Sequence, residues 1–157
     1  MQIYPSDKGV GTDIGCDYGR QDADDFWVAK LTIYAVKAEA GDTAAQAFAR
    51  YQAEVKRKYP TAKVLGTAIE FTEEPPPEMK DVQSEEYEIM MNGRRYQSDL
   101  IVAMKAGWVI EIRGSSAMEA ADGSEGVMAL GDLANPSLAL MQALSTIGTN
   151  IAPVPLK

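Results

Sequence analysis

The segment from Tyr87 to Arg113 predicts three consecutive β-strands joined by two tight turns. The first turn is Asn92-Gly93, which is typical of a two-residue type I′ turn because both of its positions need a positive φ. The pairs that this turn predicts are Met91 with Arg94, Ile89 with Tyr96, and Tyr87 with Ser98. Since side chains alternate between the two faces of a strand, this register decides which residues share a face.

The second turn predicts a register of its own. Lys105-Ala106-Gly107 fits a three-residue loop with glycine at the final, left-handed position. The pairs that it predicts are Met104 with Trp108, Val102 with Ile110, and Leu100 with Ile112. Together the two registers predict one apolar face, made of Tyr87, Ile89, Tyr96, Leu100, Val102, Met104, Trp108, Ile110 and Ile112. The apolar residues expected on the open, outward face are Tyr34, Met90, Ile101 and Val109.

The rest of the chain supplies further strands and two helices. Alternation of polar and apolar residues predicts strands within 11–20 and 26–36, and a third over 63–72. A helix is predicted over 43–58, because Thr43 and Gln46 form a capping box and apolar residues recur at helical spacing behind them. Asn135-Pro136 would begin a last helix over 137–147.

The predicted order is β-β-α-β-β-β-β-α, which indicates a two-layer α+β protein with a mainly antiparallel sheet and helices packed on one face. Residues 1–157 would form a single domain, with 1–8 and 149–157 as loose termini. The helix at Thr43, the Asn92-Gly93 hairpin and the strand over 108–113 before a C-terminal helix resemble the PsbP/Mog1-like fold. That fold includes small bacterial envelope proteins, so the resemblance implies a bacterial, envelope-associated protein.

Composition argues against several classes of function. The net charge of −8 has the wrong sign for a general nucleic-acid binder or for an anionic membrane surface. No run of about 20 apolar residues occurs, so no membrane insertion is expected. Export to the periplasm is favoured if a leader was removed before Gln2, and the cytoplasm otherwise.

Conventional catalytic and metal-binding arrangements are missing from the sequence. There is no histidine, and Cys16 is the only cysteine, so histidine-based catalysis and a cysteine-rich zinc site are excluded. No GxSxG elbow, SxxK arrangement or P-loop occurs. We therefore predict no catalytic residue, no metal site and no cofactor.

Three charged residues of the outward sheet face are the candidate binding residues: Asp99, Glu111 and Arg113. In the predicted registers Asp99 lies opposite Arg113 and Glu86, and Ile101 lies opposite Glu111. Arg113 would clamp an anion, or Glu111 would act as a general base. The structural interpretation is an ordinary cross-strand ion pair that contributes about 0.2–1 kcal/mol.

The sequence leaves three functions open. The first is a non-catalytic binding module for a protein partner or a small ligand. The second is an enzyme that acts on a small substrate with Glu111, Asp99 and Arg113. The third is a structural homo-oligomer that pairs through an exposed edge strand within 11–20.

Overall fold

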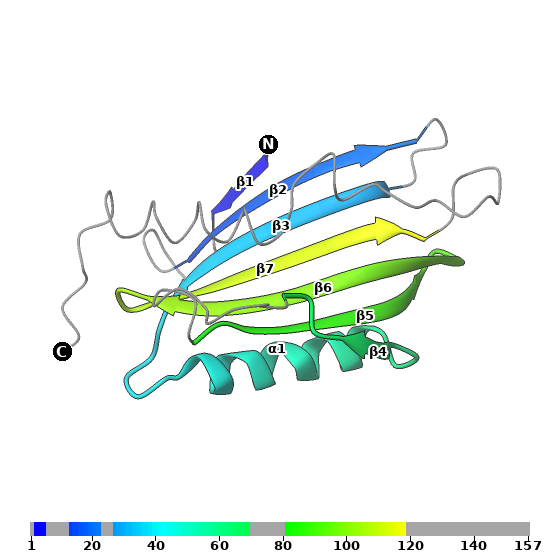
Figure 1. Cartoon of the computed structure of the whole chain (residues 1–157). Coiled ribbons are helices and arrows are strands. Elements are labelled where there is room, and N and C mark those ends of the chain that lie inside the picture. The colour runs from blue at the N-terminus through cyan, green and yellow to red at the C-terminus, as the bar shows by residue number, and fades with distance from the viewer. Residues whose placement is uncertain (1, 6–12, 23–26, 70–80, 119–157) are drawn as a thin grey trace.

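The computed structural model describes residues 2–5, 13–22, 27–69 and 81–118, and these form one antiparallel sheet with a helix on one face (Figure 1). The strands are β1 (Gln2–Pro5), β2 (Asp13–Gln21), β3 (Trp27–Lys37), β4 (Lys63–Gly66), β5 (Gln83–Met91), β6 (Arg94–Lys105) and β7 (Trp108–Ala117). Their order across the sheet is β1-β2-β3-β7-β6-β5-β4, and every neighbouring pair is antiparallel. The expected α+β class with a mainly antiparallel sheet is confirmed.

The helix α1 (Ala44–Lys58) begins where the sequence predicts it. The Thr43 side chain accepts a hydrogen bond from the Gln46 backbone N–H at 3.2 Å, and Gln46 Oε1 accepts one from the Thr43 backbone N–H at 3.0 Å. This capping box satisfies two backbone donors that the first turn of a helix would otherwise leave unpaired. The helix ends before Pro60, which cannot continue it. Figure 1 shows α1 alongside β5 and β6, with which it makes its main contacts.

The first predicted turn is confirmed together with its register. Asn92 and Gly93 have φ values of 52° and 78°, as a type I′ turn requires. The observed pairs are Met91 with Arg94, Ile89 with Tyr96, and Tyr87 with Ser98.

The second predicted register is wrong by one residue. Ala106 and Gly107 have φ values of 52° and 81°, so they form another two-residue turn, and Lys105 belongs to β6. The observed pairs are Lys105 with Trp108, Met104 with Val109, Val102 with Glu111, Ile101 with Ile112, Leu100 with Arg113, and Asp99 with Gly114. The three-residue loop was expected because it places only Gly107 in the left-handed conformation, whereas in the structure Ala106 adopts a positive φ as well.

This shift by one residue divides the expected apolar face between two cores. On the α1 side the core holds Ala38, Ala47, Val55, Tyr87, Ile89, Tyr96, Leu100, Val102 and Val109. On the opposite side it holds Leu31, Ile69, Ile101, Ala103, Trp108, Ile110 and Ile112. The run from Leu100 to Ala103 is buried throughout, as in a strand that is covered on both faces. Ile101 and Val109, which were expected to be outward, are therefore buried.

The edges of the sheet also differ from expectation. A short strand, β1, lies within the stretch that was predicted to be a loose terminus, and it pairs with Ile14–Asp17 of β2. The expected free edge within 11–20 is therefore occupied along that stretch. At the other side β4 ends at Gly66, although the sequence predicted a strand to position 72. The predicted last helix, over 137–147, and the terminus 149–157 lie outside the described residues.

The positive φ of Ala106 leads to a prediction about the free energy of unfolding. Replacing Ala106 by Asn should raise the free energy of unfolding by about 0.5–1 kcal/mol, because Asn tolerates the left-handed conformation better than Ala. Urea denaturation would measure this change, and Asn92→Ala, at the equivalent position of the first hairpin, should lower the stability by a similar amount. A destabilised Ala106→Asn variant would contradict the two-residue turn.

Candidate functional site

Glu111 and Arg113 lie on the face of the sheet that α1 covers. They are two residues apart on β7, so their side chains point to the same side. Glu111 pairs with Tyr34 of β3 and Val102 of β6, and Arg113 occupies the next row with Thr32 and Leu100. The expected outward position is wrong, because only 4% of Glu111 is exposed.

Two side chains of α1 complete this group. Arg113 Nε donates a hydrogen bond to Glu111 Oε1, and Arg113 Nη2 donates one to Glu54 Oε2 at 3.1 Å. The guanidinium carbon of Arg113 lies 5.9 Å from the centre of the Tyr51 ring. Tyr51 and Glu54 are three residues apart on the helix, so they share one face. We call Glu111, Arg113, Tyr51 and Glu54 the Arg113 cluster; it joins β7 to α1.

Burial controls the electrostatics of the Arg113 cluster. It raises the pKa of Glu111 to about 6, although the Arg113 guanidinium opposes the shift. Burial also raises the pKa of Tyr51 to about 12, and the negative charges of Glu111 and Glu54 add to that shift. A carboxylate with a pKa near 6 is suited to proton transfer near neutral pH. Arg113 donates to one carboxylate of β7 and one of α1, so the cluster links the sheet to the helix.

A second polar link joins α1 to β5. Gln52 Nε2 donates a hydrogen bond to Glu85 Oε2 at 2.8 Å, and the Tyr87 hydroxyl donates to the same oxygen. Burial and this hydrogen bond raise the pKa of Tyr87 above its ordinary range. The helix is therefore held to the sheet by polar contacts as well as by its apolar face.

Asp99, the third candidate, lies on the other face of the sheet. It pairs with Gly114 and not with Arg113, whereas its predicted pairing with Glu86 is confirmed. Only 6% of Asp99 is exposed, and its Oδ1 has no hydrogen-bond partner in the part of the chain that the structure describes. Burial raises its pKa to about 6, and the charge of Glu86 adds to the shift. The structure brings Glu111 and Arg113 together and separates both from Asp99.

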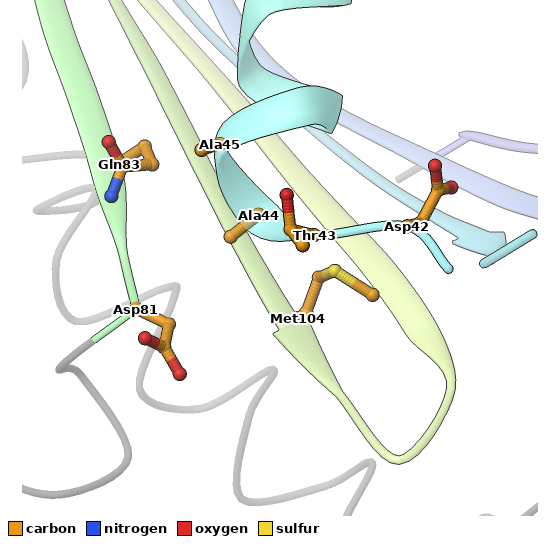
Figure 2. A pocket seen from close by; sticks show the side chains of 7 residues that line it. All are labelled: Asp42, Thr43, Ala44, Ala45, Asp81, Gln83 and Met104. Atoms are coloured by element: carbon orange, nitrogen blue, oxygen red, sulfur yellow. The ribbon is translucent and has the colours of Figure 1, made fainter. Parts of the chain in front are cut away.

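A cavity of about 370 Å³ lies at the N-terminal end of α1. Figure 2 shows Asp81 and Gln83 on one side of it, Asp42 on the other, and Met104 beneath the first turn of the helix. Asp42 is already engaged, because Arg50 donates hydrogen bonds to both of its oxygens at 2.8 and 3.0 Å. A helix N-terminus favours anions, whereas carboxylates at the rim favour cations, so charge selects no class of ligand here.

The outer edge of β4 exposes apolar side chains to solvent. β4 is the last strand in the described sheet order, and all four of its residues are exposed. Val64 and Leu65 are 53% and 48% exposed, and Met90 of the neighbouring β5 is 46% exposed. The sequence predicted a strand through Val64 and Leu65, but no local pattern indicated that it would form an exposed edge of the sheet.

Two further findings concern metals and membranes. Across the four described ranges, no group of three or more Cys, Asp or Glu side chains could hold a metal ion. No helix in those ranges has the length and apolar character needed to cross a bilayer.

Comparisons with known proteins identify no family for this chain. No protein-family model and no curated protein matches it. Among solved structures, it is similar to the crystal structure of PA94, a protein of unknown function from Pseudomonas aeruginosa. The TM-score is 0.47 and the sequence identity 13%, over 99% of each chain. Neither value supports a transfer of function.

Proposed function

We propose that this chain is a non-catalytic binding module that takes an extended segment of a protein partner at the outer edge of β4. The observation that carries the proposal is the exposure of two consecutive apolar residues, Val64 and Leu65, on β4, one of the two edge strands of the described sheet. An edge strand presents backbone N–H and C=O groups that a further strand can pair with. In proteins that bind partners by strand addition, backbone hydrogen bonds along such an edge give affinity, and nearby side chains give specificity.

Features of β4 favour a different protein over a second copy of the chain. The strand has only four residues, carries Lys63, and has a register shift between Val64 and Gly66. Short length, an edge lysine and a bulge are the means by which proteins discourage edge-to-edge self-association. Two such edges would pair poorly, whereas a partner segment can adapt its shape and charge to this one.

The proposal includes a bacterial, envelope-associated setting in the periplasm. The resemblance to PsbP/Mog1-like proteins was based on the order of helices and strands. From β2 onwards the described elements follow the order β-β-α-β-β-β-β, and this order supports the proposed setting. A catalytic alternative based on Glu111, Arg113 and Asp99 has less support, because these residues lie on two faces of the sheet.

A photo-crosslinker at position 65 would test the proposal. Benzoylphenylalanine in place of Leu65 is expected to capture one defined protein in extract of the cells that make this chain. The matched control carries the same group at Ala49, an exposed position of α1. Mass spectrometry of the adducts would identify the captured protein.

Two results would overturn the proposal. One is an absence of adducts at position 65, or equal adducts at positions 65 and 49. The other is a crosslink between two copies of the chain, which would instead support a homo-oligomer.

A further inference from the structure

We infer that the segment taken at β4 is acidic; this inference rests on the proposed function and names the class of partner. The whole chain has a net charge of −8, yet positions 55–69 contain four basic residues and no Asp or Glu. The four are Lys56, Arg57, Lys58 and Lys63. β4 therefore belongs to a basic stretch of an acidic chain, and the acidic residues beside it, Glu85, Glu86 and Glu88, lie on its inner neighbour β5.

Three of these cations form the last turn of α1, and all three are exposed. Within the described ranges none of them forms an ion pair, and Lys58 Nζ lies 5.4 Å from the centre of the Tyr59 ring. Lys63 differs, because its Nζ lies 3.0 Å from Glu88 Oε1. The charges of the last helical turn are thus available to a ligand.

The path of the chain brings these cations beside the edge of the sheet. α1 and β4 are joined by residues 59–62, which form a turn closed by a hydrogen bond from the Ala62 N–H to the Tyr59 carbonyl oxygen at 2.9 Å. Figure 1 shows β4 beside the C-terminal end of α1. Val64 pairs with Tyr87, whose side chain lies in the core on the α1 side, so Val64 points to that side as well.

A strand added outside β4 would alternate its side chains between the two faces of the sheet. On the α1 side it would meet Val64 and the cations of the last helical turn, so acidic side chains are favoured at every second position. The intervening positions would lie beside Leu65, the other exposed apolar residue of β4. The occupant with the matching chemistry is an extended segment that alternates acidic and apolar residues.

The test compares two triple variants with the same change in net charge. The first is Lys56→Gln, Arg57→Gln and Lys58→Gln, at the end of α1. The matched control is Arg20→Gln, Lys37→Gln and Lys105→Gln, on other parts of the sheet. Binding is measured by fluorescence anisotropy with two labelled octapeptides, one of alternating Glu and Val and one of alternating Lys and Val. Thermal unfolding of each variant checks that the helix remains folded.

We expect the unmodified chain to bind the Glu-Val peptide in preference to the Lys-Val peptide. The triple change in α1 should weaken that binding about tenfold, because each exposed pair contributes modestly and three act together. The control triple should change it little. In the crosslinking experiment, the same triple change in α1 should likewise reduce the yield of partner adducts formed at position 65.

Equal binding of the two peptides, or equal loss in the two triples, would overturn the inference. If position 65 still captures its partner with undiminished yield in the α1 triple, the acidic character is wrong while the docking edge stands. If position 65 captures nothing even in the unmodified chain, the proposed function itself fails.

Discussion

Replacing Arg113 by methionine is expected to lower the free energy of unfolding by about 3 kcal/mol at pH 8, because Glu111 would stay buried without its cation. Glu111 is 4% exposed, and Arg113 is its hydrogen-bonded partner in the Arg113 cluster. Methionine keeps much of the length and apolar contact of the arginine stem, so the loss would report mainly on charge.

The loss should be smaller at pH 5. The pKa of Glu111 is about 6 in the folded protein, against an ordinary 4.5, and Arg113 holds it below the value that burial alone would impose. Without Arg113 the pKa rises further, so the folded variant carries a protonated, neutral Glu111 at pH 5. A raised carboxyl pKa means that stability is lost as pH rises, so the variant suffers most at pH 8.

Urea denaturation at pH 5 and pH 8 would check this expectation. The control is the double variant Glu111→Gln with Arg113→Met, which removes both charges and should recover most of the loss at pH 8. An equal loss at both pH values, or a double variant as unstable as the single one, would show that Arg113 stabilises by packing alone.

The second large effect is a gain in stability. Replacing Asp99 by asparagine should raise the free energy of unfolding by about 2–3 kcal/mol at pH 7.5. Burial raises the pKa of Asp99 from 3.8 to about 6, so the folded state opposes its ionisation. The folded protein is therefore most stable, as far as Asp99 is concerned, when this carboxyl is protonated. That contribution to the free energy of unfolding is fully present below about pH 3.8 and is lost as the pH rises through about 6. Asparagine has nearly the same shape and stays neutral throughout.

The gain should disappear at acid pH, where Asp99 itself is neutral. Chemical denaturation at pH 4 and pH 7.5 would show the difference, with Glu86→Gln as the control. Glu86 acts on Asp99 through its charge alone, so removing that charge should give a smaller gain in the same direction. If Asp99→Asn destabilises the protein at pH 7.5, then the ionised carboxylate has a stabilising role in the native state.

Local chemistry explains which parts of the fold were predictable. The start of α1 follows from Thr43 and Gln46, which satisfy each other's backbone within one turn. The first hairpin follows from Asn92-Gly93, because both residues tolerate the left-handed conformation. Ala106 has no such preference, so the sequence around it permits a loop of two or three residues. Packing on both faces of the sheet chose between them.

The register of the second hairpin also determined which candidate residues share a face of the sheet. Glu111 and Arg113 share a face in any register, because they are two positions apart on one strand. Asp99 lies on a different strand, so the shift by one residue moved it to the opposite face. The contacts of Arg113 with Glu54 and Tyr51 depend on where α1 crosses the sheet. No local pattern of the sequence specifies that crossing.

The sequence by itself determined the α+β class, the capped helix and the first hairpin, since each depends on interactions among neighbouring residues. Only the tertiary structure decided the second register, the two cores and the exposed edge at β4. The physical reason is that Leu100–Ala103 is apolar at consecutive positions, so its pattern fits either face of a strand. When a strand is buried on both faces, its own sequence pattern does not specify its register. The register is then set by packing against the neighbouring strands and the helix.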